Sequence, residues 1–163
     1  MRVRTNRIVS GSLLLAVGLM VTGCAGRGVS TGGPGWDPEL AKLGSIEVTA
    51  KLVEIPKDAI FDRENYNYAT VLKYQVQEVH RGRVKGDTIY VGQYNPAKPR
   101  SEVADKLVPD IGGNLKSFRS GQVHRMALDA SMIDQFTGGI LNKYAEEDTD
   151  PIYWAVWTNL VSD

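Results

Sequence analysis

The sequence predicts a mainly β fold, a small closed barrel of five strands with one or two short helices. Segments in which apolar and polar residues alternate recur over residues 46–158 and are separated by turn residues. In the first two segments the apolar residues change sides, which is typical of bulges that bend strands around a barrel. The 163 residues, less a predicted leader, suffice for one hydrophobic core.

The first two strands carry these changes of side. The first is predicted over residues 46–55, before Pro56, with a bulge at 52–53. The second is predicted over residues 68–80, with a bulge at 77–78 that returns Val79 to the apolar side. Such bulges favour a closed barrel over a flat sheet.

The remaining strands are predicted over residues 88–94, 122–128 and 152–158. The strand over 88–94 follows a glycine-containing connection and forms a hairpin with the second strand. Short helices are expected over residues 37–43, 101–107 and 131–136, from their capping residues and the glycines that follow them. Residues 46–128 carry most of these elements.

The N-terminus has the composition of a leader peptide. Arg2, Arg4 and Arg7 precede an apolar run over residues 8–21. That run is shorter than the about 20 residues that span a hydrocarbon core, and it has the dimensions of a signal-peptide core. A buried N-terminal helix is the alternative, which the three arginines disfavour.

Residues 21–24, Val-Thr-Gly-Cys, follow this run. They resemble the lipobox of bacterial lipoproteins. The resemblance implies cleavage after residue 23, a diacylglycerol on the sulfur of Cys24, and acylation of its new amino group. Cys24 is the only cysteine in the chain, and acylation gives this lone thiol a role. The alternative is ordinary cleavage and a soluble secreted protein.

These features divide the chain into a signal peptide (1–23), a lipid-anchored flexible tether (24–44) and a β-barrel domain (45–163). Five of the eleven residues from 25 to 35 are glycine, a composition that favours a coil with a reach of ~18 Å. The resemblance implies a bilayer as partner. It also implies sorting to the outer membrane of the cell envelope, because no Asp follows Cys24.

The strand pattern carries a second resemblance. A long second strand ends in Val79, His80, Arg81 and Gly82, and Gly121 precedes a later alternating strand. Over residues 46–128 this is similar to the OB-type barrel of netrin-like (tissue-inhibitor-like) domains, including bacterial lipoprotein versions. The chain lacks the disulfide cysteines of the animal domains, so their protease-inhibitory ridge is not carried over and no functional residue transfers.

Charge is unevenly distributed along the chain. Without the leader there are 16 basic and 19 acidic residues. Residues 73–125 hold ten basic and five acidic residues, whereas residues 126–163 hold one basic and seven acidic residues. The basic stretch could attract polyanions, although a solvated strand face is the favoured interpretation. Nucleic acid is not expected as a partner of an exported protein.

Aromatic and basic residues form the candidate ligand-binding set. Aromatic side chains on an OB-type sheet can stack on sugars, and nearby cations can bind acidic groups, which would suit an acidic polysaccharide of the envelope. The favoured alternative is that the aromatic residues are core residues. The set comprises Tyr90, Tyr94, Trp154 and Trp157 with Lys98, Arg100, Lys116 and Arg119.

No catalytic constellation, metal site or cofactor is predicted. His80 and His124 lie 44 residues apart, and each is followed by an arginine that disfavours a cation. Ser120 and His124 at the start of one strand would not face each other, and no nucleophile elbow is present. Gly112 and Gly113 lack the Lys of a phosphate loop.

Three functions follow as hypotheses. The first is a non-catalytic envelope lipoprotein whose barrel binds another envelope protein or a polysaccharide. The second is an envelope-acting enzyme that uses His80 or His124 as a base. The third is a purely structural surface lipoprotein.

Overall fold

A computed structural model describes residues 32–62, 66–144 and 146–163. The predicted signal peptide, its cleavage position and Cys24 lie outside these residues. The helices are α1 (Pro38–Lys42), the 3-10 turn η1 (Arg100–Glu102) and α2 (Met132–Gln135). The strands are β1 (Ile46–Glu54), β2 (Tyr68–Arg81), β3 (Thr88–Tyr94), β4 (Val123–Asp129), β5 (Gly139–Leu141) and β6 (Ile152–Ser162).

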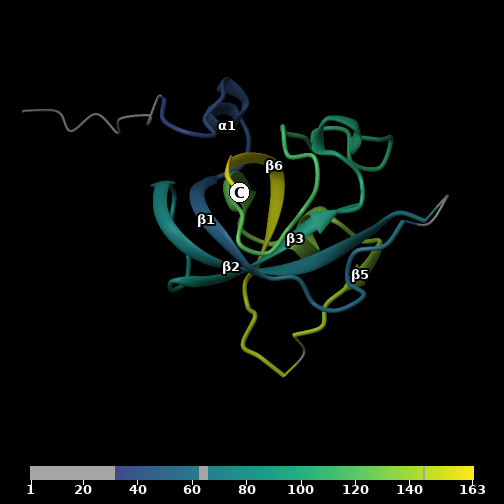
Figure 1. Cartoon of the computed structure of the whole chain (residues 1–163). Coiled ribbons are helices and arrows are strands. Elements are labelled where there is room, and N and C mark those ends of the chain that lie inside the picture. Colours follow the sequence, from purple (N-terminus) through teal and green to yellow (C-terminus); the bar gives the residue numbers. More distant parts are fainter. Residues whose placement is uncertain (1–31, 63–65, 145) are drawn as a thin grey trace, which may run out of the picture.

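The six strands form one mixed sheet in which hydrogen bonding runs in a ring (Figure 1). β1 pairs with both β2 and β4, β2 pairs with β3, and β6 lies between β3 and β4. The pairing of β3 with β6 is parallel, and the other pairings within the ring are antiparallel. The predicted β class and the hairpin of the second and third strands are confirmed.

Both predicted bulges are present in the pairing of β1 with β2. Residue 53 of β1 and residue 77 of β2 each lack a partner in the register. A third irregularity, which the sequence did not reveal, falls at His80 of β2. Val79, expected on the apolar side, pairs with the buried Val48 but is itself 41 % exposed.

Several elements differ from the sequence prediction. A sixth strand, β5, pairs in parallel with the first residues of β2, and β6 continues four residues beyond the predicted end at residue 158. The helix expected over residues 101–107 is reduced to η1. The carboxylate of Asp105 accepts hydrogen bonds from the backbone N–H groups of Leu107 and Val108, and this local turn replaces a helix.

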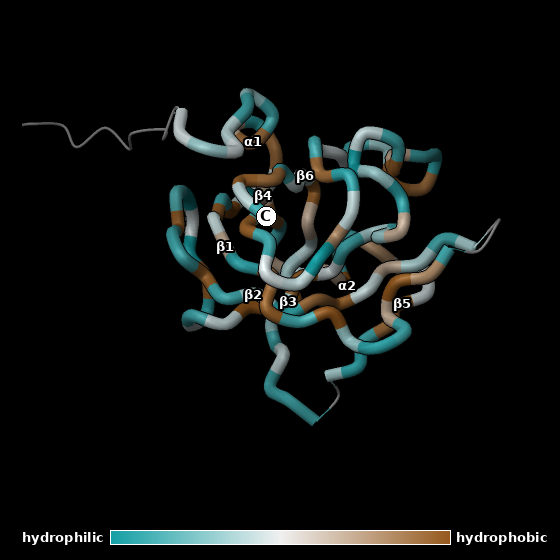
Figure 2. Tube along the Cα trace, in the orientation of Figure 1, coloured by the Kyte–Doolittle hydropathy of each residue, from teal (hydrophilic) through white to brown (hydrophobic). Residues whose placement is uncertain are grey.

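Apolar side chains pack on both faces of the strands. Inside the ring lie alternating apolar residues of β1, β2, β3, β4 and β6, together with Leu115 and Phe118 from the connection between β3 and β4. A second cluster on the outer face joins β2, β3 and β6 to α2. Figure 2 shows apolar residues along the strands and hydrophilic residues over the connection before β6.

Neither α1 nor α2 is long and apolar enough to cross a bilayer, and no other helix in the described part of the chain is.

Candidate functional site

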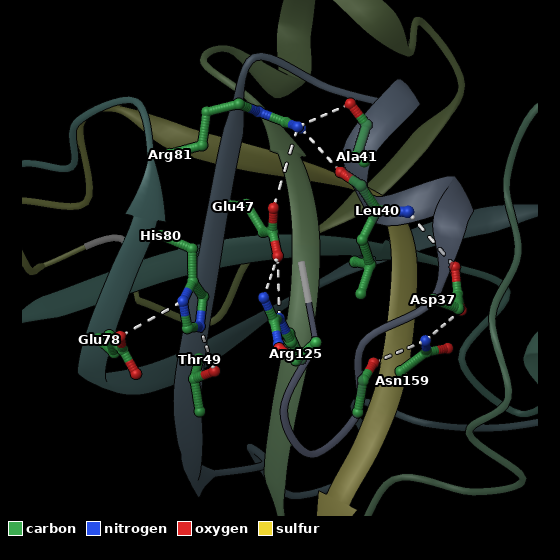
Figure 3. Close-up of polar contacts among 12 residues, drawn as sticks. Asp37, Leu40, Ala41, Glu47, Thr49, Glu78, His80, Arg81, Arg125 and Asn159 are labelled. Carbon is green, nitrogen blue, oxygen red and sulfur yellow. Dashed lines mark hydrogen bonds and ion pairs between the residues drawn. The ribbon is translucent and has the colours of Figure 1, made fainter. Parts of the chain in front are cut away.

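A buried ion pair on the outer face of the ring joins β1 to β4 (Figure 3). The Nε and Nη2 atoms of Arg125 lie 2.9 Å and 2.6 Å from Oε1 of Glu47. Both side chains are 2 % exposed. Charges removed from water destabilise a fold unless they are paired and hydrogen-bonded. The segment that covers this face must therefore offer polar groups to the ion pair.

The residues that cover the pair come from the N-terminal segment, residues 32–44. Nη1 of Arg125 donates to the carbonyl oxygen of Gly32 at 2.8 Å. Leu40 of α1 is fully buried. The segment is therefore part of the folded domain.

Arg81 holds the other end of this segment. Its guanidinium donates to the carbonyl oxygens of Leu40 and Ala41 at 2.9 Å each and to that of Leu43 at 2.6 Å. These carbonyls lie at the end of α1, where they lack partners within the helix. Nη1 of Arg81 also lies 3.9 Å from Oε2 of Glu47. One carboxylate thus links two arginines that bind both ends of the segment.

Asp37 connects the segment to β6. Its Oδ1 caps α1 by accepting the N–H groups of Glu39 and Leu40. Its Oδ2 accepts hydrogen bonds from Nε1 of Trp157, at 2.9 Å, and from Nδ2 of Asn159. Burial acts to raise the pKa of Asp37, but these hydrogen bonds together outweigh it and hold the pKa below its usual value.

Glycines in this segment permit close contact with the strands. A Cβ at Gly35, where φ is +73°, would lie 2.6 Å from a methyl group of Val161. A Cβ at Gly44, where φ is +62°, would lie 2.6 Å from the carbonyl oxygen of Leu128. The glycine-rich composition that predicts a flexible tether through residue 44 thus has a second role here, since these glycines allow docking.

The domain boundary therefore differs from the predicted one. The tether was expected to extend to residue 44, with the domain beginning at 45. Residues 32–44 instead bind the outer face of β1, β4 and β6. The predicted helix over residues 37–43 is confirmed as α1 with Asp37 as its N-cap.

His80 belongs to the edge of this site. Its Nε2 lies 2.8 Å from the hydroxyl of Thr49, and its Nδ1 lies 3.4 Å from a carboxylate oxygen of Glu78. The side chain is 7 % exposed. Burial, followed by the charge of Arg125, lowers the pKa of His80, so the ring favours its neutral form.

His124 lies inside the ring on β4 and is fully buried. Its Nδ1 lies 3.1 Å from the hydroxyl of Tyr74, and its Nε2 lies 3.1 Å from Oε1 of Gln122. Burial lowers the pKa of His124 to about 4. Both ring nitrogens have protein partners, so His124 is not presented to an external substrate in this structure.

The aromatic members of the candidate ligand-binding set lie mainly in packed positions. Tyr90, Tyr94 and Trp154 belong to the outer apolar cluster, with exposures of 7, 0 and 2 %. The hydroxyl of Tyr94 donates to Asp105 at 2.7 Å. Trp157 is half-buried against the N-terminal segment. The rings thus occupy core and docking positions, in agreement with the alternative favoured from sequence.

The basic members of the set all belong to the connection between β3 and β4. Lys98, Lys116 and Arg119 are exposed, and Arg119 pairs with Asp163 at 2.6 Å. Arg100 is 1 % exposed, and its guanidinium carbon lies 5.2 Å from the centre of the Phe118 ring. The connection itself runs along β6, where Gly112 pairs with Trp157.

We call the set of residues that binds the N-terminal segment to the strands the dock; it consists of Asp37, Glu47, Arg81 and Arg125. The sequence analysis did not predict this role for any of them. One signal was present. Glu47 and Arg125 have opposite charges and lie on the outward side of two predicted strands. Their pairing required knowledge that β1 and β4 are neighbours.

Within residues 32–62, 66–144 and 146–163, no three His, Cys, Asp or Glu side chains are grouped to hold a metal ion. Comparisons of the chain with models of protein families, with curated proteins and with solved structures returned no match. The role of the dock is therefore inferred from its own residues.

Replacing Glu47 with Gln should destabilise the protein strongly. The E47Q change leaves the buried Arg125 without its countercharge, and loss of one partner of a buried pair costs about 3–5 kcal/mol. The measurement is the free energy of unfolding from urea denaturation. The control is D148N, at a pair with Lys85 whose side chains are 62 % and 76 % exposed, and it should have almost no effect.

A double variant, E47M/R125M, should lose less stability than E47Q, because neither charge is then buried alone. Equal and small effects of E47Q and D148N would contradict the importance of the pair.

Stability should fall as the pH decreases from about 6.5 to about 4. In this range the unfolded chain binds a proton at His124 that the folded chain does not, because the folded pKa is about 4. The expected loss is about 2–3 kcal/mol over the window. Urea denaturation at a series of pH values measures it.

The H124Q variant should flatten this pH dependence. H80Q is the matched control and should leave most of it in place, since residue 80 is only partly buried whereas His124 is fully buried. A profile that H124Q does not alter would show that His124 is not the buried base responsible.

Proposed function

We propose that this chain is a lipid-anchored lipoprotein of the bacterial cell envelope, held by an acylated Cys24, whose domain binds another envelope component without catalysing a reaction. A polysaccharide carrying acidic groups is the partner that the exposed charges favour. Sorting to the outer membrane is part of the proposal and rests on the residues after Cys24.

The observation that carries the proposal is the short distance in sequence between the lipobox and the dock. Gly32, whose carbonyl oxygen is bound by Arg125, lies eight positions after Cys24. Even a fully extended chain of this length spans at most about 29 Å. An acylated Cys24 would thus hold the domain close to the bilayer, at a fixed point on the outer face of β1, β4 and β6.

We also propose that the ring of strands is an OB-type barrel of the netrin-like kind. Support comes from the order in which the five long strands pair, from the parallel contact of β3 with β6, and from the bulges that bend β1 against β2. Irregularities of this kind allow strands to curve until a sheet closes.

Binding is favoured over catalysis by the positions of the two histidines. The enzyme hypothesis uses His80 or His124 as a base. His124 is enclosed in the ring, and His80 is held between Thr49 and Glu78. A general base needs access to the proton that it removes, and neither ring offers this in the described structure.

A saccharide with acidic groups is favoured by the basic connection between β3 and β4. Lys98 and Lys116 are exposed there, and Lys98 already acts electrostatically on the carboxylate of Asp105. Cations on an irregular surface segment can bind carboxylates without a catalytic group.

The C24S variant tests the anchor. Wild-type protein expressed in a bacterium and labelled with radioactive palmitate should carry the label and remain in the membrane fraction. C24S should lose the label and retain the leader, because the sulfur that accepts the diacylglycerol is absent. The control S30A changes a residue outside the lipobox and should be labelled like the wild type.

Mass spectrometry of the native protein decides the same point independently. A mature chain that begins at Cys24 with bound acyl chains supports the proposal. A bare thiol at Cys24, or a chain that retains residues 1–23, would refute it.

A further inference from the structure

Arg100 occupies an unusual position for a charged residue. It begins η1 in the connection over residues 95–122, and its backbone N–H donates to the carbonyl oxygen of Leu115 at 2.8 Å. Leu115 in turn donates to the carbonyl oxygen of Thr158 in β6. These bonds place the side chain of Arg100 at the end of the ring, where it is 1 % exposed.

The guanidinium of Arg100 is only partly satisfied. Nη2 donates to the carbonyl oxygens of Asn95 and Lys98 at 2.7 Å and 3.1 Å. Nε and Nη1 are buried and have no hydrogen-bond partner among the described residues. Phe118 covers one face of the group. Unused N–H donors on a buried cation are uncommon in folded proteins, because their desolvation is not offset.

No carboxylate of the described residues lies in ion-pair contact with Arg100, unlike Arg125 in the dock. Burial lowers the pKa of Arg100 to about 10, so the group remains protonated at neutral pH. A positive charge is therefore enclosed at one end of the ring without a negative partner.

The groups near Arg100 inside the ring are neutral. Burial raises the pKa of Tyr74 and outweighs the opposing effect of the Arg100 charge, so the phenol stays protonated. Gln93 and His124 adjoin this phenol. A cation among neutral hydrogen-bonding side chains suits an oxyanion and would not suit a metal ion.

We propose that Arg100 binds the carboxylate of an acidic saccharide, with the unused N–H groups of Nε and Nη1 as donors. The inference rests on the proposed function and names the ligand group that the domain recognises. The carboxylate supplies the missing countercharge, and exposed Lys98, Lys116 and Arg119 on the same connection attract the polyanion.

Binding at this place requires a local movement. Phe118 is 8 % exposed and lies against the guanidinium, so the ligand displaces this ring. The residues on either side of the ring are held in place, since Leu115 donates to the carbonyl oxygen of Thr158 and Gly121 donates to that of Leu52, so the movement is confined to residues 116–118.

The test uses the full mature lipoprotein in detergent micelles, with 15N-labelled arginine. Sodium glucuronate and a short oligomer of galacturonic acid are the probes, and a neutral galactose oligomer is the control. The Nε–H resonance of Arg100 should shift with either acid and should not shift with the neutral sugar. Calorimetry should give the oligomer the higher affinity.

Variants locate the contact. R100M should weaken binding of the acidic oligomer by about ten- to hundred-fold, the effect expected when a charge-assisted hydrogen-bonded contact is lost. R83M, at an exposed arginine in the turn between β2 and β3, is the matched control and should bind like the wild type. R100K, which preserves the charge, should bind more weakly than the wild type and more tightly than R100M.

Each other outcome overturns the inference. An unshifted Arg100 resonance, or equal affinities of R100M and R83M, would show that Arg100 is not the contact. Binding of inorganic phosphate but of neither acidic sugar would show that the group recognised is a phosphate. Equal affinities for poly-glutamate and for the acidic oligomer would show that the site does not recognise a saccharide. Because the resonance is measured in the wild type, the test remains valid if R100M fails to fold. The acylation of Cys24 is measured separately, so failure here leaves the anchor untouched.

Discussion

The buried ion pair between Glu47 and Arg125 is the interaction on which the outer face of β1, β4 and β6 depends. Neither charge is exposed to water, so each requires the other. Arg125 also donates a hydrogen bond to the carbonyl oxygen of Gly32 in the N-terminal segment. The second carboxylate oxygen of Glu47 faces Arg81, which binds the other end of that segment. A hydrophobic pair in the same place would join the strands but would not select a polar backbone as its cover.

This arrangement has a consequence for the proposed anchoring. A lipid on Cys24 would not suspend the domain on a long coil, because the chain is bound to the strands from Gly32 onward. The place where the domain faces the membrane would then be set by the dock, and the connection between β3 and β4 would keep a constant relation to it. Such a geometry would favour a module that presents one surface to its ligand.

Local signals accounted for much of the fold. Alternating side chains gave five strands close to their observed bounds, and changes in that alternation gave the irregularities at residues 53 and 77. The three-residue strand β5 was missed because so short a segment has no detectable period. The helix expected over residues 101–107 does not form beyond η1, because the carboxylate of Asp105 accepts hydrogen bonds from backbone N–H groups that a helix would have used.

The dock was beyond sequence reasoning for a different reason. Its ion pair joins residues that are 78 positions apart in the sequence. The glycines of its segment are typical of a flexible linker, so the sequence did not indicate that the segment docks. The burial of Arg100 likewise follows from the path of the connection and from no local pattern. Tyr90, Tyr94 and Trp154, by contrast, are buried, as the favoured alternative to ligand binding expected.

Hydrogen exchange of the full mature protein in micelles tests most directly whether residues 32–44 belong to the domain. The backbone N–H groups of Trp36, Leu43 and Ser45 donate to Gly33, Glu39 and Leu128, so they should exchange far more slowly than those of an unstructured peptide. In E47Q the protection of Trp36 and Leu43 should fall well before that of β3. Exchange of residues 32–44 at the unstructured rate in the wild type, beside protected strands, would contradict the account.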